Sequence, residues 1–457
     1  MKKNSFFTFR KTLLACGVIL NFISLQAQQW ENVGASANVS AGNSSYNNLV
    51  VDASGNYFLS YYDGSVAKGS VQKFDGSSWS YLGGAPGITS GTALYNSLSI
   101  DALGNVFYTN QGTGLEVRKF SGNAWSPLTS ATTNAVNYHA SAVSPTNTLF
   151  TYASDGSGTV RRLVNNTWEQ VGNAGFSGGA TFAEMVIGTN NKVYTCNVLS
   201  GVRVYENSTT ATSTDTWTIL GGAIVDASSS GEQYTSDIAI DGSNNIYVAY
   251  ISTSALGRKI NVKKWNGTAW SQVGNANFSL KAVQHLAIAV TSSGNPYVVA
   301  SQWDSSDGNH LRNTVYKFDS TSNTWSTLGG DFVSDGQVTY NDLFVDSTNN
   351  YLVLAYSQGS TRVKRISLSA LSVSDTRKEV SAIYPNPTTG IIYFKGDDKI
   401  KSVEITNTVG RIIKSKNDAE KVDISNAPTG VYFVTIKTST GKTTTKKIIK
   451  NKFHIIV

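Results

Sequence analysis

Three acidic residues could do chemistry together, because each follows an aromatic residue near the start of a short apolar segment: Glu184, Asp237 and Asp342. The segments YNNLVVD and YNDLFVD show the pattern, in which Asn48 and Asp342 stand two residues after a tyrosine. Two carboxylates roughly 5 to 10 Å apart can act as acid, base or nucleophile across a glycosidic bond. Carboxylates and amides beside aromatic rings also suit the simple binding of a sugar, through hydrogen bonds and stacking.

The aromatic residues recur at one place in the pattern. Alignment of the segments on the turn that follows them brings together Tyr46, Tyr95, Tyr138, Phe182 and Tyr340, with Tyr234 nearby. Two residues on, the aligned set is Asn48, Ser97, Ala140, Glu184, Asp237, Ala287 and Asp342. We therefore predict a ligand-binding site from the following residues: Tyr46, Asn48, Tyr95, Tyr138, Glu184, Asp237, Tyr340 and Asp342. The alternative is that the tyrosines pack the interior and the acids are solvated.

Trp303 is a separate candidate for ligand contact. It stands in SQWDSSDGNH, at the start of the longest insertion between repeated segments, and it breaks the repeat of the other tryptophans. We predict that it contacts ligand from a loop.

Catalytic signatures of the common kinds are missing from the chain. It has no GxSxG, HExxH, paired CxxC or P-loop sequence. His139, His285, His310 and His454 are scattered, so we expect no metal site and no cofactor. Cys196 lies in the apolar run VYTCNV and is expected to be a buried small residue rather than a nucleophile.

Tryptophan marks a repeat that must position these residues. The motif recurs as WENVG, WSYLGG, WSPL, WEQVG, WTILGG, WSQVG and WSTLGG, at residues 30, 79, 125, 168, 217, 270 and 325. Each repeat carries an inner strand, a DASGN-like turn, a second strand, a third strand such as VQKF or VRKF, and the Trp strand. This is an antiparallel meander with hairpin turns, and its period is typical of a propeller blade.

The ends of the repeat predict how the ring closes. Seven third strands are present, but the last, which ends at Ile366, has no Trp strand after it. The missing strand stands at the other end, at Trp30, so we expect it to complete the last blade and remove an exposed sheet edge. The fold class is therefore all-β, with a seven-bladed β-propeller over residues 28–375.

These repeats resemble secreted bacterial seven-bladed propellers with a D-x-x-G-N-x-Y/F turn, and their last hairpin is similar to that of a kelch repeat. The aspartates of the turns (Asp52, Asp101, Asp241 and Asp346) are interpreted as turn caps rather than calcium ligands. The repeated tryptophans are expected to pack between blades. The basic residues of the third strands are expected to snorkel along apolar surface or to pair with a neighbouring blade: Lys73, Lys119, Arg162, Lys264, Lys317 and Arg365.

The N-terminus is expected to be a signal peptide over residues 1–27. Lys2, Lys3, Arg10 and Lys11 precede the apolar run TLLACGVILNFISL, and Leu25-Gln26-Ala27 is a plausible cleavage site. No later stretch approaches the length of a membrane span, so we predict no transmembrane segment in the mature chain.

The C-terminal part differs in composition and motif. After a linker at 376–383, YPNPTTG begins at Tyr384, and alternating runs such as IIYF and GVYFVTIKT predict a small β-sandwich over residues 384–457. The YPNPTTG opening, the Gly410-Arg411 turn, the PTGVY stretch and the KIIK end resemble the type A sorting domain of type IX secretion substrates. This resemblance implies recognition by the type IX translocon and a secreted or cell-surface location.

Charge argues against nucleic acid as a partner. The chain carries a net charge of +7. Residues 28–375 have 18 Lys and Arg against 23 Asp and Glu, whereas residues 376–457 have 15 against 7. The propeller is therefore mildly acidic and offers no electrostatic footprint for nucleic acid.

Three functions remain open from the sequence. The preferred one is an exported, non-enzymatic propeller that binds a glycan or a surface protein. The second is a polysaccharide lyase or glycoside hydrolase that uses Glu184, Asp237 and Asp342. The third is a structural component of the surface or matrix, for which no pocket is expected.

Overall fold

The computed structural model describes residues 29–179, 181–232, 234–303, 311–368, 382–395, 399–408, 410–439 and 443–451. The predicted signal peptide (1–27) and most of the predicted linker (376–383) lie outside these residues. The chain divides into two compact units, Met1–Leu368 and Ser369–Val457. Each unit is described below by itself.

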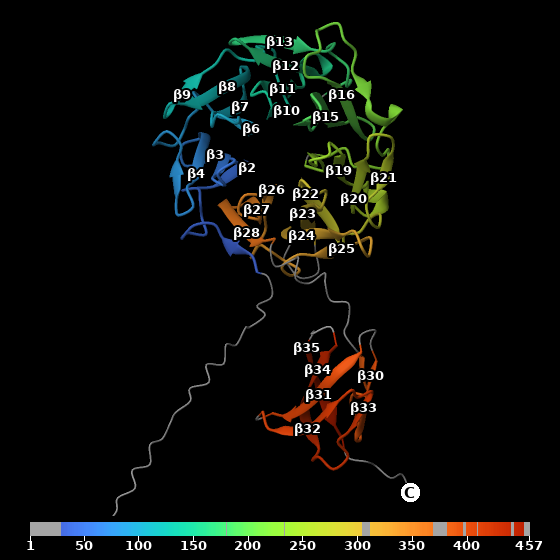
Figure 1. The fold of residues 1–457 in the computed structure, drawn as a ribbon. Coiled ribbons are helices and arrows are strands. Elements are labelled where there is room, and N and C mark those ends of the chain that lie inside the picture. Colours follow the sequence, from blue (N-terminus) through green and yellow to red (C-terminus); the bar gives the residue numbers. More distant parts are fainter. Residues whose placement is uncertain are drawn as a thin grey trace, which may run out of the picture. The chain divides into compact units, whose positions relative to one another are not determined.

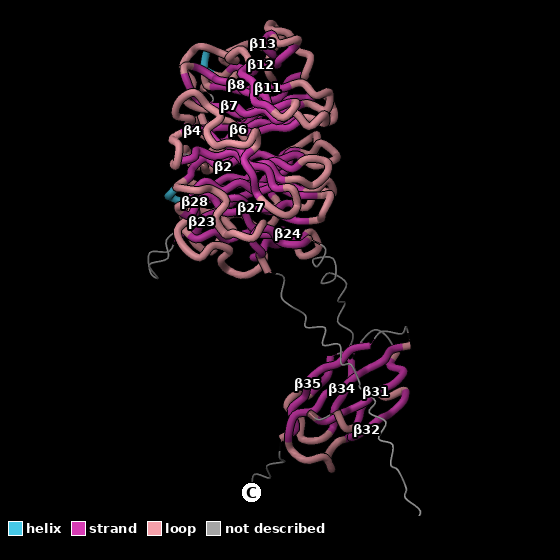
Figure 2. The backbone as a smooth tube through the Cα atoms, turned by 90° about the vertical axis from the view of Figure 1, so that its left-hand side faces the viewer, coloured by secondary structure: helices cyan, strands magenta, loops and turns pink. Residues whose placement is uncertain are grey.

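The described part of the first unit consists of four-stranded antiparallel sheets that surround a centre like the blades of a propeller (Figure 1). Helix in the described residues is limited to three short 3-10 turns, and Figure 2 shows strands and loops almost throughout. These turns are η1 (Asp155–Ser157), η2 (Leu220–Gly222) and η3 (Ser254–Leu256).

Six of these sheets each use four consecutive strands, and the first strand of each lies innermost (Figure 1). The first three sheets are β2 (Ser44–Val51), β3 (Tyr57–Asp63), β4 (Lys68–Phe74) and β5 (Trp79–Tyr81); β6 (Leu94–Ile100), β7 (Val106–Gly112), β8 (Gly114–Ser121) and β9 (Ala124–Pro127); and β10 (His139–Val143), β11 (Leu149–Ala153), β12 (Thr159–Val164) and β13 (Thr167–Val171). The next three are β14 (Glu184–Ile187), β15 (Lys192–Val198), β16 (Val202–Ser208) and β17 (Thr218–Ile219); β18 (Ser236–Ile240), β19 (Ile246–Ile251), β20 (Ile260–Trp265) and β21 (Trp270–Gln272); and β22 (Ala282–Val290), β23 (Pro296–Trp303), β24 (Arg312–Asp319) and β25 (Thr324–Thr327).

One further sheet of this unit joins the two ends of the repeat. It contains β26 (Thr339–Asp346), β27 (Tyr351–Gln358), β28 (Ser360–Ser367) and the N-terminal β1 (Glu31–Asn32). β1 pairs antiparallel with β28, with Glu31 opposite Arg365. The strand that follows Trp30 therefore covers the edge of a sheet whose other strands come more than 300 residues later.

The repeated tryptophans connect neighbouring sheets. Each donates a hydrogen bond from its indole Nε1 to a backbone carbonyl at the end of the preceding sheet's last strand, at 2.7–3.1 Å. Trp30 bonds to Leu328 in this way, and Trp79 bonds to Val33. At the Trp325 contact the residue that follows the accepting carbonyl must be glycine, because a Cβ at Gly274 (φ +67°) would lie 2.7 Å from the indole of Trp325.

The recurring turn of the repeat is stabilised by its aspartate. Asp52 Oδ1 accepts hydrogen bonds from the backbone N–H groups of Ser54 and Asn56, both at 2.9 Å, and its Oδ2 accepts from Asn56 Nδ2 at 2.7 Å. Asp101 and Asp241 make the same three contacts in their turns. These aspartates therefore act as turn caps.

The basic residues of the third strands lie over aromatic rings of the second strands. Lys73, Lys119 and Lys264 place Nζ 5.0–5.6 Å from the ring centroids of Phe58, Phe107 and Tyr247. Cation–π attraction holds them on the sheets, so they form no free basic ring.

The hydrophobic core of the first unit lies between neighbouring sheets. One cluster joins Leu49, Tyr57 and Leu59 to Val353 and Ala355 of the sheet that contains β1. Because each sheet buries both faces in this way, the inner strands are held in fixed positions around the centre.

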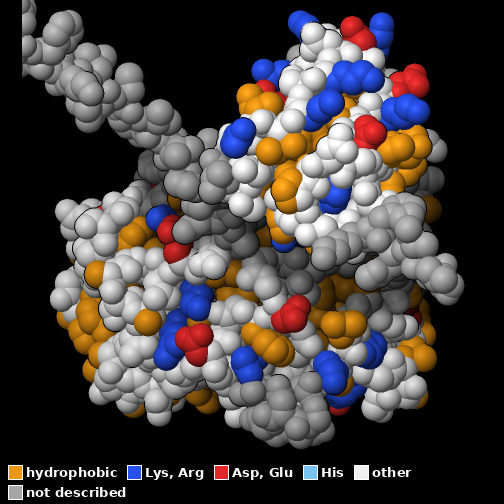
Figure 3. Space-filling view, turned by 90° about the horizontal axis from the view of Figure 1, so that it is seen from below, with side chains coloured by type: hydrophobic (Ala, Val, Ile, Leu, Met, Phe, Trp, Pro, Cys, Tyr) orange, Lys and Arg blue, Asp and Glu red, His pale blue; other side chains and the backbone are white. Residues whose placement is uncertain are grey.

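The second unit contains two sheets that share one core, as in a β-sandwich. The sheets are β29 (Ala382–Tyr384), β30 (Ile391–Lys395) and β33 (Lys421–Asp423), and β32 (Ile412–Asn417), β31 (Ile400–Asn407), β34 (Gly430–Thr438) and β35 (Thr443–Lys450). Ile392, Val403, Ile405, Val434 and Ile436 are buried between them. In Figure 3 the Lys and Arg side chains of the described residues are interspersed with Asp and Glu side chains.

Candidate functional site

An unusual backbone conformation recurs near the start of the inner strands. Six residues there have φ between +48° and +59°, which bulky side chains rarely adopt: Tyr46, Tyr95, Phe182, Tyr234, His285 and Tyr340. In four inner strands the pairing register shifts at the same place, for example between Ser45 and Asn48 and between Thr339 and Asp342. Such a β-bulge re-aims a side chain. We call these six residues, together with Tyr138, the aromatic position.

Hydrogen bonds from the next sheet compensate for this strained conformation. Asn47 Nδ2 donates to the carbonyl oxygen of Tyr340 at 2.9 Å, and Asn96 Nδ2 donates to that of Tyr46 at 2.9 Å. Asn341 Nδ2 donates to the His285 carbonyl at 2.7 Å. Packing and hydrogen bonds around the ring therefore maintain a conformation that would cost on the order of 1–3 kcal/mol by itself.

The side chains of the aromatic position form a chain of contacts. Tyr46 lies 4.7 Å from both Tyr95 and Tyr340 between ring centroids. The chain continues from Tyr95 through Tyr138 (6.0 Å) to Phe182 (4.9 Å), and from Tyr340 to Tyr234 (5.4 Å) and His285 (5.5 Å). Within the described residues it is interrupted between Phe182 and Tyr234.

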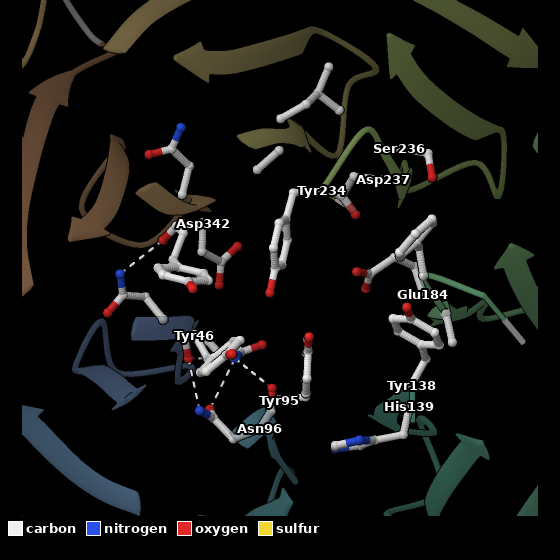
Figure 4. Close-up of a pocket in the computed structure, with 18 residues that line it drawn as sticks. Tyr46, Tyr95, Asn96, Tyr138, His139, Glu184, Tyr234, Ser236, Asp237 and Asp342 are labelled. Atoms are coloured by element: carbon white, nitrogen blue, oxygen red, sulfur yellow. Dashed lines mark hydrogen bonds between the residues drawn. The ribbon is translucent and has the colours of Figure 1, made fainter. Parts of the chain in front are cut away.

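All of these rings except that of His285 line a cavity of about 150 Å³ where the inner strands begin. In Figure 4 the side chains of Tyr46, Tyr95, Tyr234 and Glu184 point into the same central space. The space can receive one small group, such as a single sugar ring, rather than a long stretch of polymer. The described residues that line it are Tyr46, Asn47, Asn48, Tyr95, Asn96, Tyr138, His139, Phe182, Ala183, Glu184, Tyr234, Ser236, Asp237, Leu286, Ala287, Tyr340, Asn341 and Asp342.

Two of the three carboxylates also join neighbouring sheets. Asp342 accepts hydrogen bonds from the backbone N–H of Leu343 and, across the sheet boundary, of Leu49. Asp237 accepts from the N–H of Ile238 at 2.7 Å and from that of Ile288, in the next sheet, at 2.8 Å. We call the place that Asp237 and Asp342 occupy, two or three residues after the aromatic position, the acceptor position.

Glu184 differs from the two aspartates. It occupies the acceptor position of the sheet β14–β17, opposite Cys196 in the strand pairing. Among the described residues, no group donates a hydrogen bond to its carboxylate. Glu184 is therefore the carboxylate of the cavity that remains available to a ligand.

Burial raises the pKa of all three acids, and repulsion from neighbouring acids adds to this shift for Asp342 and Glu184. Burial raises the pKa of Asp237 to about 6, although the N–H groups of Ile288 and Ile238 act in the opposite direction. Burial raises the pKa of Asp342 to about 7, with repulsion from Asp237 as a further contribution. The pKa of Glu184 is raised well above its usual value by burial and by the charges of Asp237 and Asp342.

Several buried polar atoms in the cavity wall have no hydrogen-bond partner among the described residues. They are the Tyr234 hydroxyl, Ser236 Oγ and both ring nitrogens of His139. Burial lowers the pKa of His139 to about 4, and the Thr109 backbone opposes this shift, so its imidazole is neutral at pH 7. Unpaired buried polar groups are unfavourable, and a polar ligand or water in the cavity would satisfy them.

Most of the predicted site residues come together in this cavity. Its lining includes Tyr46, Asn48, Tyr95, Tyr138, Glu184, Asp237, Tyr340 and Asp342. Trp303 is not part of the lining; it ends β23 with 48% of its surface exposed, and contact of Trp303 with a ligand stays a prediction.

Sequence reasoning missed other residues of the site. His285 occupies the aromatic position but was not counted with the tyrosines, although Ala287 two residues later was aligned. The asparagines at 47, 96 and 341 were also missed. Their signal was the Tyr-Asn pair in YNN, YNS and YND.

Comparison with known proteins identifies the C-terminal unit. Residues 382–451 match the family model of the secretion system C-terminal sorting domain. The chain is accordingly a type IX secretion substrate, and the protein is secreted or located at the cell surface. No curated protein matches the chain in sequence. No helix in the described residues has the length and apolar character needed to cross a membrane.

Solved structures show a likeness of fold. A fungal alcohol oxidase of the AA5 family, in complex with copper, aligns with a TM-score of 0.52 and 12% identity, over 93% of this chain and 100% of the other. An ulvan lyase bound to its saccharide aligns with a TM-score of 0.46 and 10% identity, over 73% and 96%. A lectin in complex with α-methyl fucoside aligns with a TM-score of 0.43 and 13% identity, over 65% and 99%. At such identities the first likeness concerns the fold alone.

Proposed function

We propose that the protein is an exported glycan-binding propeller, whose ligand enters the cavity lined by the aromatic position. The four-stranded sheets of residues 28–375 would be the blades of a seven-bladed propeller. Residues 1–27 would be removed as a signal peptide, 376–383 would be a linker and 384–457 would direct type IX secretion. The propeller would then act outside the cell, anchored or released.

The observation that carries this proposal is the chain of aromatic rings around a small cavity with unsatisfied polar atoms. Tyrosine faces stack on the apolar face of a sugar, and hydroxyl, amide and carboxylate groups beside them can bond its hydroxyls. The left-handed conformation at Tyr46, Tyr95 and Tyr340 supports a functional role, because the strain is located where the rings are aimed inward.

Catalysis is a second candidate, favoured by the raised pKa values of Asp237 and Asp342. A glycoside hydrolase commonly needs two carboxyl groups free to act on substrate. Asp237 and Asp342 both accept backbone N–H groups across a sheet boundary. Within the described residues, Glu184 is the one acid of the three without a hydrogen-bond donor on its carboxylate, which favours binding over cleavage of the glycan.

A glycan array tests the proposal. The chain without its predicted signal peptide (residues 28–457) should bind specific glycans, and Tyr46→Leu should weaken the strongest interaction about tenfold through loss of one stacking face. Tyr393→Leu is the matched control, because Tyr393 is a half-exposed tyrosine of the C-terminal unit.

The hits should also be incubated with protein and analysed for cleavage. Intact glycan supports a binding protein, and cleaved glycan supports the second candidate. Absence of binding to every glycan of the array would contradict the proposal and favour a protein ligand or a structural role.

A further inference from the structure

At the acceptor position, three of the seven side chains accept a hydrogen bond from the next sheet, and Glu184 is not one of them. In each case the donor is an inner-strand N–H: Asp342 accepts from Leu49, Ser97 from Ser141, and Asp237 from Ile288. The equivalent donor for Glu184 is the N–H of Ile238, but this group donates to Asp237 Oδ1 at 2.7 Å. The carboxylate of Glu184 therefore occupies the acceptor position, but among the described residues no backbone N–H of the next sheet donates a hydrogen bond to it.

The chain of aromatic contacts is interrupted at the same boundary. Within the described residues, Phe182 contacts Tyr138 and Tyr234 contacts Tyr340 and His285, but Phe182 and Tyr234 do not contact each other. Phe182 precedes β14 and Tyr234 precedes β18, so the gap lies between the sheets β14–β17 and β18–β21. The ring of side chains is open beside Glu184.

Unsatisfied donors are present beside this opening. Ser236 is 95% buried and its Oγ has no hydrogen-bond partner in the described part of the chain, and the same holds for the hydroxyl of Tyr234. Figure 4 shows Tyr234, Ser236, Asp237 and Glu184 around the same side of the cavity. A ligand group placed there would bond Ser236 and Tyr234 and meet the Glu184 carboxylate.

The charged side chains among the described residues that line the cavity are all acidic. Its lining contains three acids, and none of the described lining residues is Lys or Arg. His139 is neutral at pH 7 because burial lowers its pKa to about 4. Tyrosine faces also attract cations, through the negative face of the ring. An anionic sugar such as a uronic acid would be repelled, whereas a single positive charge would be attracted.

We propose that the site between the sheets β14–β17 and β18–β21 binds the ammonium group of an amino sugar, with Glu184 as its counter-ion. This deepens the proposed glycan binding and rests on it. Glu184 contacts the ammonium, Tyr234 and Ser236 bond the neighbouring hydroxyls, and the rings of the aromatic position stack on the sugar. Asp237 and Asp342 hold the sheets and contribute negative potential.

Binding of a cation should release a proton. The titratable groups that face Glu184 are Asp237, Asp342, Cys196 and Tyr234, and His139 lines the same cavity. Burial and the negative charges of Asp237 and Asp342 raise the pKa of Glu184, and an ammonium beside its carboxylate would lower that pKa again, so ligand binding favours release of a proton. Affinity should increase with pH until the ligand amine itself loses its proton.

Three matched oligosaccharides test the proposal by calorimetry with the chain 28–457. β-1,4-linked tetramers of glucosamine, N-acetylglucosamine and glucose differ only in the group at carbon 2. The glucosamine tetramer should bind at least about tenfold more tightly than the other two at pH 7. Glu184→Gln should remove this preference, and Glu169→Gln, on the outer strand β13, should retain it.

Proton release is measured with wild-type protein in two buffers of different ionisation enthalpy, so this readout does not depend on the folding of a variant. Thermal unfolding of Glu184→Gln should show whether that variant folds. Equal affinity for the three tetramers, or binding of glucosamine without proton release, would overturn the amine proposal.

A fourth probe separates this proposal from the proposed function. Cyclohexylammonium carries a ring and an ammonium group but no hydroxyls. If it binds and no sugar binds, glycan binding fails while the cation site stands. If neutral tetramers bind as well as the glucosamine tetramer, the glycan proposal stands and the amine proposal fails. If none of the four probes binds, the amine proposal fails, and the glycan array decides the proposed function separately.

Discussion

The outer and inner strands belong to the same repeated sequence unit, but equivalent positions carry the same residue in the outer strands and different residues in the inner strands. At the outer strands every repeated tryptophan donates the same hydrogen bond to the preceding sheet. At the inner strands the acceptor position holds Asn48, Ser97, Ala140, Glu184, Asp237, Ala287 and Asp342. Uniform residues at the outer strands serve closure of the ring, which needs the same contact at every boundary. Variation at the inner strands is typical of a site, because a ligand contacts each sheet differently.

The largest expected effect is that of Trp30→Ala, which tests whether the outer contact closes the ring. The substitution removes the indole packing against Gly329 and the hydrogen bond to Leu328 at the boundary that joins the two ends of the repeat. The free energy of unfolding should fall by about 3 kcal/mol, as for other large aromatic truncations. Urea unfolding measures this loss, with Leu103→Ala, 76% exposed, as the control. An effect no larger than that of the control would mean that the outer contact does not close the ring.

A smaller effect on the free energy of unfolding is expected from Asp342→Asn, and this effect should depend on pH. The pKa of Asp342 is about 7 in the folded chain, above the unfolded value of about 3.9, so the folded state binds the proton more tightly. Its contribution to stability is therefore present below about pH 4 and is lost as the pH rises through about 7.

Relative to the wild type, Asp342→Asn should gain stability between pH 4 and pH 8, on the order of 2 kcal/mol. Chemical unfolding at several pH values measures this difference. Asp75→Asn, at an exposed turn, should show no such gain, and a parallel pH profile for Asp342→Asn and wild type would refute the prediction.

Tyr234→Phe should separate an effect on stability from an effect on glycan affinity. Its hydroxyl is buried and, within the described residues, unpaired, so its removal should leave stability unchanged or raise it by up to about 1 kcal/mol. Affinity for the glycan should nevertheless fall about tenfold, because the hydroxyl is expected to bond the ligand. Thermal unfolding and calorimetry give the two values. Loss of stability together with unchanged affinity would assign this hydroxyl to the fold instead.

The smallest effect is expected from Lys119→Met. The substitution keeps an apolar stem but removes the ammonium that lies 5.6 Å from the Phe107 centroid. Stability should fall by about 0.5 kcal/mol, and glycan affinity should not change. A change in affinity measured by calorimetry would contradict the assignment of the third-strand basic residues to the fold.

The aligned repeats predicted much of the candidate site. Because the turn aspartates Asp52, Asp101 and Asp346 keep a constant distance from the inner strand, alignment on them located Tyr46, Tyr95 and Tyr340 correctly at one place. Tyr234 was placed only nearby, because one extra residue separates it from Asp237. His285 was missed because the alignment considered only tyrosine and phenylalanine at this place.

The roles of the acids could not be predicted. Asp342 contacts Leu49 across 293 residues, and Asp237 contacts Ile288 across 51. Alternation along a strand indicates which face a side chain occupies, but not which backbone group the next sheet presents to it. Glu184 looked equivalent to the aspartates in sequence and is distinct only in space.

The sequence by itself determined the repeat, the turns, the Trp strand at each end and the sorting signal, because each depends on local spacing and local hydrogen bonds. The tertiary structure decided the left-handed aromatic position, the partners of the three carboxylates and their raised pKa values. These properties depend on burial and on contacts between sheets, and burial exists only after distant repeats have packed around a common centre.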